Sequence, residues 1–358
     1  ARDLATSTVL LIAALPIILF CAHYVLANTP LRKYTERGWI SRTPLPVISL
    51  VIVAICGIII MSFLAGPQLI FTKIGDITKP LVAPISDRLG VTVAENRQPF
   101  FNEWTSSFGP VVAGIPLFFW LFFFGSVYLF YQVTKDFSPK QRWLLTGSYL
   151  FFFIALIFSR YSDTSLFNGT NTISLLFYLS GILVLLGAFG FVYYRNYRKN
   201  TLEGFRGIDF GTILLFSLFF FSIVSARGSV RTILVLVPVA SIMVSYLAVS
   251  LIASAQSHRE QKRIVVAVLA GVVVLASAYS AIAFYNESIT LAESYIPSAY
   301  TYQWQHAMSW VRNSTPQNAV FAHWWDYGYW VQTIGERATV LDGGNAQVYW
   351  NHLLGRHV

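Results

Sequence analysis

Charged residues are scarce in this sequence. Asp, Glu, Lys and Arg make up only 11% of the 358 residues, whereas hydrophobic residues make up 55% and aromatic residues 16%. A soluble globular domain carries about 25% charged residues. The composition therefore excludes an ordinary soluble fold and indicates that the lipid bilayer is the solvent.

Cysteine is scarce, and glycine-rich phosphate-binding loops are missing. The two cysteines, Cys21 and Cys56, lie inside apolar runs, which excludes a disulfide framework. No glycine-rich phosphate-binding fingerprint occurs, which argues against a soluble nucleotide ligand. The chain also lacks an initiator Met, a signal-peptide pattern and any terminating feature at its last residues, so we expect both ends to be cuts.

Long apolar runs dominate what is present. A membrane helix needs about 20 mainly apolar residues. Eight stretches come close to this length: residues 4–27, 44–71, 110–133, 143–159, 173–194, 211–226, 230–253 and 264–285. The fourth and the sixth of them are short. The sequence therefore predicts a multi-pass, all-α membrane domain over residues 1–285, with about eight helices.

The basic residues indicate the orientation of these helices. The net charge of +9 could reflect nucleic-acid binding, but Lys and Arg gather in alternate loops, at residues 31–42, 134–142, 195–206 and 257–263. Such loops stay on the cytoplasmic side. The loop 72–109 and everything after Tyr285 are then external, as are the three N-x-Ser/Thr sequons at Asn168, Asn286 and Asn313. We therefore expect membrane lipid, and no nucleic acid, as a partner.

After residue 285 the sequence becomes mixed, polar and aromatic. The pattern predicts an amphipathic helix over residues 298–311 and a short strand over residues 319–322. It also predicts a strand that ends in a turn over residues 339–345. We expect residues 286–358 to begin a mixed α/β extracytoplasmic domain.

The densest local pattern is the aromatic run from His323 to Trp330. Bulky aromatics usually form buried core, and His323 is expected to be structural. In this run, however, Asp326 follows two indole N–H donors, Trp324 and Trp325, which suits a small pocket for a hydroxyl. Gly328 is expected to let the backbone bend sharply.

The run Trp324, Trp325, Asp326, Tyr327 and Gly328 resembles the five-residue signature of the catalytic subunits of oligosaccharyltransferases, which are C-type glycosyltransferases of the membrane. The resemblance implies that Trp324, Trp325 and Asp326 hold the Ser or Thr at position +2 of an acceptor sequon. A site that binds a hydroxyl in this way rejects substrates that lack it.

A second motif lies in the external loop 72–109. Considered alone, Glu95 is expected to be a solvated surface carboxylate. The segment Thr92-Val93-Ala94-Glu95 is nevertheless similar to the family's Ser/Thr-Val/Ile-x-Glu motif. The resemblance implies that Glu95 accepts hydrogen bonds from the side-chain amide of the acceptor Asn, in a loop that opens and closes.

A third motif is the corner at residues 226–231, between two apolar runs. Basic residues there oppose the charge bias of external loops, and they are either arginines that snorkel at the interface or functional groups. The resemblance implies that Arg231 contacts the phosphates of a lipid-linked donor, with Arg227 as the second choice. Arg160 is expected to be structural.

The resemblance also implies a divalent metal, Mn²⁺ or Mg²⁺. The family's acidic metal-binding motifs do not occur in this chain, so the ligands are unknown and expected outside it, with Glu95 as a possible addition. A further family motif that helps to bind the +2 hydroxyl is also missing. Six predicted helices follow the Glu95 loop, where the family typically has four, so 143–194 is either an added hairpin or an overcount.

The predicted activity is transfer of an oligosaccharide from a lipid-(di)phosphate carrier such as dolichol to Asn in Asn-x-Ser/Thr. The active site is expected on the extracytoplasmic side, facing the cell exterior or the ER lumen. The alternatives are another lipid-donor transferase, such as a protein O-mannosyltransferase, or a transporter or flippase. Whether the enzyme acts alone or in a complex stays open.

Overall fold

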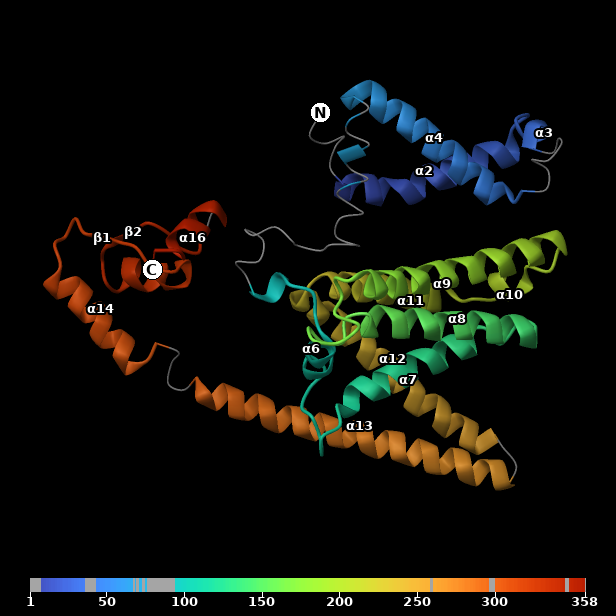
Figure 1. The fold of residues 1–358 in the computed structure, drawn as a ribbon. Helices are drawn as coiled ribbons and strands as arrows, with labels where there is room; N and C mark the ends of the chain where they lie inside the picture. The colour runs from blue at the N-terminus through green and yellow to red at the C-terminus, as the bar shows by residue number, and fades with distance from the viewer. Residues whose placement is uncertain are drawn as a thin grey trace. The chain divides into compact units, whose positions relative to one another are not determined.

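The computed structural model describes residues 8–35, 43–66, 68, 71–72, 75, 94–257, 260–295, 300–344 and 348–357. The part of the chain that it describes is mainly helical (Figure 1). Each of the eight predicted apolar stretches coincides with a helix, which confirms the prediction of a multi-pass, all-α membrane protein.

The helices that match these stretches are α2 (Thr8–Asn28), α4 (Leu45–Ala65), α7 (Leu117–Val133), α8 (Pro139–Phe158), α9 (Thr172–Arg198), α11 (Phe210–Gly228), α12 (Ile233–Ser257) and α13 (Glu260–Ser294). Among the described residues, six segments are long and apolar enough to cross a membrane, and they lie in α4, α8, α9, α11, α12 and α13. The apolar part of α2, Ala14–Asn28, and α7 are shorter.

Left-handed backbone conformations made two of the predicted helix boundaries wrong. The prediction began the third helix at residue 110, but α7 begins at Leu117 because Ala113 (φ 49°) and Gly114 (φ 80°) form a tight turn. Their left-handed backbone cannot continue a right-handed helix. Similarly, α4 ends at Ala65 and not at residue 71, since Gly66 adopts φ 84°. Part of 67–71 lies outside the described residues.

Both helices predicted between residues 143 and 194 are present in the structure. Helix α8 has 20 residues and α9 has 27, and both contain a segment that can span a membrane. The two helices predicted over residues 143–194 are therefore not an overcount.

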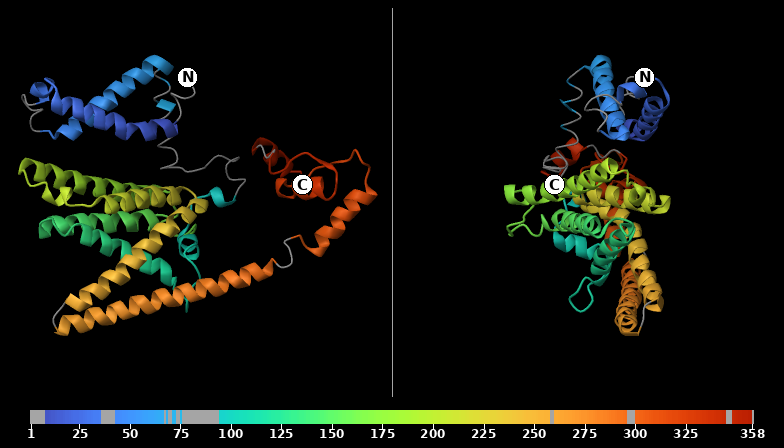
Figure 2. Two further views of the ribbon diagram at one scale, coloured as in Figure 1. Left: turned by 180° about the vertical axis from the view of Figure 1, so that it is seen from behind. Right: turned by 90° about the vertical axis from the view of Figure 1, so that its right-hand side faces the viewer.

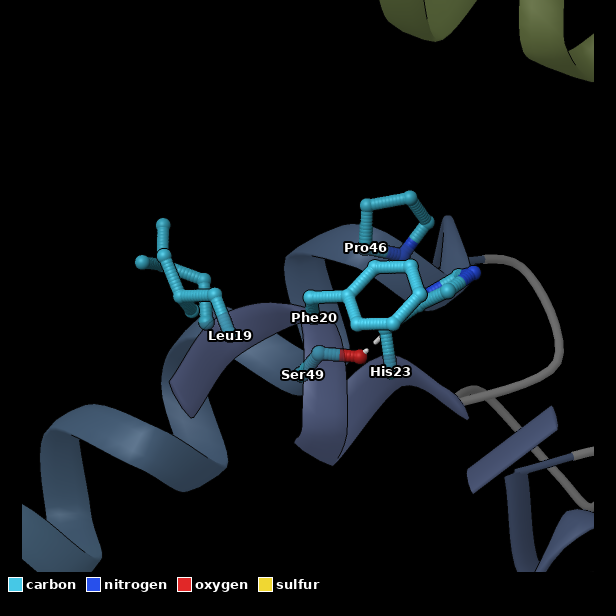
Figure 3. Close-up of a pocket in the computed structure, with 6 residues that line it drawn as sticks. Leu19, Phe20, His23, Pro46 and Ser49 are labelled. Atoms are coloured by element: carbon cyan, nitrogen blue, oxygen red, sulfur yellow. Dashed lines mark hydrogen bonds between the residues drawn. The ribbon is translucent and has the colours of Figure 1, made fainter. Parts of the chain in front are cut away.

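The chain divides into two compact units, and the division falls inside α8 and α9. Unit 1 comprises Ala1–Val82, Val133–Phe152 and Leu179–Asp209. Within it, α2 packs against α4 and is followed by the short α3 (Arg32–Thr35). The two long helices line an open pocket of about 410 Å³, where His23 Nδ1 lies 3.5 Å from Ser49 Oγ (Figure 3).

Elsewhere in unit 1, the basic loop after α9 folds onto the segment before α8. The short helix α10 (Glu203–Arg206) carries Phe205, whose ring meets Phe137 edge to face at 4.8 Å. Gln141 Nε2 donates to Asn196 Oδ1 at 2.6 Å. These contacts hold the predicted cytoplasmic ends of α8 and α9 together.

Unit 2 has an aromatic core built by α7, the end of α8, and α11. Phe123 stacks on Phe153 at 4.7 Å, and Phe219 meets Phe153 edge to face at 5.8 Å. Gly125 of α7 lies so close to α12 that a Cβ there would come within 2.9 Å of the Met243 carbonyl oxygen. Small residues permit such close helix packing in membranes.

Helix α13 packs against α12 and is one unbroken helix of 35 residues (Figure 2). It continues past residue 285 to Ser294, so the change in composition at Asn286 does not end the helix. The predicted domain division at 285/286 stays a prediction.

The C-terminal segments form a small mixed assembly. They are α14 (Tyr302–Ser314), β1 (Val320–Phe321), η5 (Trp325–Tyr327), α15 (Gly328–Thr333), β2 (Ala338–Thr339) and α16 (Val348–Leu354). The strands β1 and β2 pair in parallel, and Met308, Val311 and Val331 form the buried core. The predicted helix at 298–311 and strand at 319–322 therefore match α14 and β1, although the β-structure among the described residues is limited to two short strands.

Candidate active site

The segment that begins at Ala94 is anchored by the corner at residues 226–231. Glu95 lies in the 3-10 turn η3 (Ala94–Asn96), and Arg231 lies in η4 (Val230–Thr232). Ser229 Oγ donates to the Glu95 carbonyl oxygen at 2.9 Å, and the Val230 N–H donates to the Arg97 carbonyl oxygen at 2.9 Å. Two motifs that are far apart in the sequence therefore lie side by side.

The side chain of Glu95 is exposed, as is that of Arg231. The neighbouring cation Arg97 pairs with Glu103, whose carboxylate also accepts the Phe100 N–H at 2.7 Å and so caps α6 (Phe101–Ser106). Arg97 is thereby directed to Glu103 and not to Glu95. Thr92 and Val93, which complete the predicted motif, lie outside the described residues, as does most of the loop 72–109.

Arg227 occupies a different environment from Arg231. Its side chain is only 3% exposed, and its guanidinium carbon lies 5.1 Å from the centre of the Tyr178 ring. Nη2 lies 3.4 Å from Ser159 Oγ, while Nε and Nη1 have no hydrogen-bond partner among the described residues. No sequence pattern pointed to Tyr178 or Ser159, because their contact with Arg227 depends on how α8, α9 and α11 pack.

Arg160 anchors the loop between α8 and α9. Its guanidinium carbon lies 4.1 Å from the centre of the Phe100 ring, and Nη1 donates to the Asn168 carbonyl oxygen at 3.3 Å. Burial lowers the pKa of Arg160, while the Glu103 carboxylate acts in the opposite direction. These contacts agree with the structural role expected for Arg160.

The aromatic signature begins at Trp324, the residue before η5. Trp324 and Trp325 are half-buried, whereas Asp326 is exposed. Tyr327 stacks on Trp304 of α14 at 4.7 Å, which gives it a packing role. His323 Nδ1 lies 2.8 Å from the Trp324 carbonyl oxygen, and because a carbonyl can only accept, this nitrogen carries the proton.

Gly328 is required for a reason other than the predicted sharp bend. Its backbone is helical, with φ −57° and ψ −41°, so any residue could adopt it. A Cβ at Gly328, however, would lie 2.6 Å from the Leu341 carbonyl oxygen and 2.7 Å from the Asp342 Cα. The expectation of a bend was wrong, because glycine serves close backbone packing here.

Asp342 fixes the segment that packs against Gly328. Its Oδ2 accepts a hydrogen bond from Gln332 Nε2 at 2.8 Å, and its Oδ1 accepts the Gly344 N–H at 2.8 Å. This aspartate therefore shapes the turn after β2.

No three His, Cys, Asp or Glu side chains come together in the part of the chain that the structure describes. A Mn²⁺ or Mg²⁺ ion needs several oxygen ligands. The described residues therefore do not form a metal site by themselves, and the role of Glu95 as a ligand stays a prediction.

Comparison with curated proteins gives short matches. A stretch of 46 residues, 12% of this chain, is 41% identical to dolichyl-phosphooligosaccharide-protein glycotransferase 1 of Pyrococcus furiosus and equally to that of Pyrococcus horikoshii. A stretch of 49 residues is 35% identical to dolichyl-diphosphooligosaccharide–protein glycosyltransferase subunit STT3B of rice, Oryza sativa subsp. japonica. A short stretch of the chain is thus similar to oligosaccharyltransferases.

The matched stretches span 5% of each Pyrococcus protein and 6% of the rice protein. No family model matches the chain, and no solved structure matches it. The similarity is therefore confined to a small region of the chain.

Proposed function

We propose that this protein transfers an oligosaccharide from a lipid-(di)phosphate carrier to the Asn side chain of Asn-x-Ser/Thr sequons, on the extracytoplasmic side of the membrane. The observation that carries the proposal is the attachment of η3 to η4. Hydrogen bonds from Ser229 and Val230 hold the segment bearing Glu95 beside the turn bearing Arg231. A carboxylate suited to an amide and a guanidinium suited to a phosphate thus lie on neighbouring turns.

In the proposed reaction, the bond between the anomeric carbon and the phosphate oxygen breaks. A bond from the same carbon to the Asn nitrogen forms with inversion, and one amide proton is released. The amide nitrogen is a poor nucleophile because its lone pair is delocalised. The exposed Glu95 carboxylate would accept an amide N–H and favour a twisted, more reactive amide, while Arg231 would stabilise the departing phosphate.

The signature residues would supply sequon selection. Trp324 and Trp325 can donate through their indole N–H groups, and the exposed carboxylate of Asp326 can accept from the Ser or Thr hydroxyl. The proposal includes a Mn²⁺ or Mg²⁺ ion because the resemblance implies one. No step is assigned to it, since the described residues offer no complete ligand set.

The names of the similar proteins include both dolichyl-phospho- and dolichyl-diphospho-oligosaccharide donors. They support a lipid-linked donor and leave the number of phosphates open. The partners in the proposal are therefore a lipid-linked oligosaccharide and an acceptor peptide.

The test uses the full-length protein in detergent with Mn²⁺, a lipid-linked oligosaccharide and two peptides that differ only in Asn-x-Thr or Asn-x-Ala. We expect glycan transfer to the Thr peptide alone, measured by the mass increase of the peptide. No transfer from any lipid-linked donor, or equal transfer to both peptides, would contradict the proposed function.

A further inference from the structure

A pocket of about 360 Å³ lies among α7, α12, α13 and the loop before α7, within unit 2. None of the residues assigned to glycan transfer lines it. Its walls include the apolar side chains Phe108, Phe118, Val237 and Phe284. Ser277 and Ser280 of α13 add two hydroxyl groups to this apolar lining.

Ser280 differs from Ser277 and Ser241, the other two helical serines that line the pocket. Ser277 Oγ, one turn earlier in α13, donates to the Val273 carbonyl oxygen at 2.7 Å, and Ser241 Oγ in α12 donates to the Val237 carbonyl oxygen at 3.0 Å. Ser280 is 6% exposed, and its Oγ has no hydrogen-bond partner among the described residues. A buried hydroxyl without a partner is costly, above all in a bilayer. An acceptor supplied by a ligand would remove this cost.

The pocket has a size typical of small-ligand sites, which are clefts of about 300–1,000 Å³. Its apolar lining suits a hydrocarbon chain.

The depth of the pocket in the membrane indicates which polar groups of a ligand can reach Ser280. Leu234 and Val237 belong to the first turns of α12, and Ser107 belongs to the loop that precedes α7. With 25 residues, α12 is longer than the roughly 20 residues that cross the hydrocarbon core, so its first turns lie near the headgroup region. Oxygen atoms of lipid headgroups are found at that depth.

We propose that this pocket binds one membrane phospholipid. One hydrocarbon chain packs against Phe118, Val237 and Phe284, and an oxygen of the glycerol or phosphate region accepts the hydrogen bond of Ser280. This site is distinct in its lining from the residues proposed to bind the oligosaccharide donor.

The experiment titrates the full-length protein in detergent with phosphatidylglycerol that carries a photoactivatable diazirine in one chain. After irradiation, mass spectrometry locates the attached lipid. We expect attachment to concentrate on peptides that contain residues 107–118, 234–241 and 277–284. Ala281→Trp, which fills the pocket from its lining, should abolish the saturable part of this labelling.

The serines provide a matched pair of variants. Ser280→Ala should weaken the apparent lipid affinity about 2- to 10-fold, the value of one net hydrogen bond. Ser277→Ala should leave it unchanged, since that hydroxyl is used within α13.

Uniform labelling of all membrane-facing helices, equal effects of both serine variants, or displacement by a polyprenyl phosphate but not by unlabelled phospholipid would overturn the proposal. Labelling does not require glycan transfer, so its failure is distinguishable from failure of the proposed function.

Discussion

At the scale of single residues, burial separates two arginines that lie close together in the sequence. Arg231 is exposed on η4, whereas Arg227 is buried against Tyr178 and Ser159. We expect Arg231→Gln to lower kcat/KM for the lipid-linked oligosaccharide about 10- to 100-fold, the range of a charge-assisted hydrogen bond. Arg227→Met should leave the unfolding temperature unchanged or higher, because it removes a buried charge that has no carboxylate partner in the described residues.

Steady-state kinetics and thermal unfolding of both variants check this prediction. The same kinetic loss in a stable Arg227→Met variant would show that the donor reaches the buried arginine, which would require Ser159 or Tyr178 to move.

Gly328 allows a second residue-scale prediction. Gly328→Ala should destabilise the protein by about 1–3 kcal/mol, because the new Cβ would overlap backbone atoms of Leu341 and Asp342. The control is Gly187→Ala in α9, where nothing lies within 4 Å of the added Cβ. That variant should be neutral or more stable, since alanine favours a helix. Equal unfolding temperatures for the two variants would contradict the packing role of Gly328.

At the scale of elements, the attachment of η3 to η4 is the arrangement that positions Glu95. Ser229→Ala removes the hydrogen bond to the Glu95 carbonyl oxygen but leaves the Val230 N–H bond to Arg97. We expect faster amide hydrogen exchange over residues 94–100 and a loss in kcat/KM of about 2- to 10-fold. Ser217→Ala is the control, because that hydroxyl only donates to Ile213 within α11. Unchanged exchange in Ser229→Ala would argue against the attachment.

The sequence predicted all eight apolar helices, because the bilayer imposes a length and an apolar composition that can be read directly. It misplaced the start of α7, although Gly109-Pro110 and Gly114 are turn signals that precede this helix. It located Glu95 and Arg231 as separate motifs but not their proximity, since the hydrogen bonds of Ser229 and Val230 depend on tertiary packing. The sequence also did not predict the close packing at Gly328, because Leu341 lies beside this glycine only in the folded structure.

At the scale of the whole molecule, the basic loops predict the orientation in the membrane. Thr164→Cys, between α8 and α9, and Thr201→Cys, between α9 and α11, are exposed positions on opposite predicted sides. With Cys21 and Cys56 replaced by Ala, a membrane-impermeant maleimide should label Thr164→Cys in intact cells. It should label Thr201→Cys only after permeabilisation. The reverse pattern would place the proposed active site on the cytoplasmic side.

The central claim is that the Trp-rich segment selects a sequon by its hydroxyl. The most direct measurement is the ratio of kcat/KM for Asn-x-Thr and Asn-x-Ala peptides, in the wild-type protein and in Asp326→Ala. We expect kcat/KM of the wild type to be at least about 100-fold higher for the Thr peptide than for the Ala peptide. In Asp326→Ala, kcat/KM for the Thr peptide should fall, so that most of this preference is lost. An unchanged ratio in a folded Asp326→Ala protein would contradict the account.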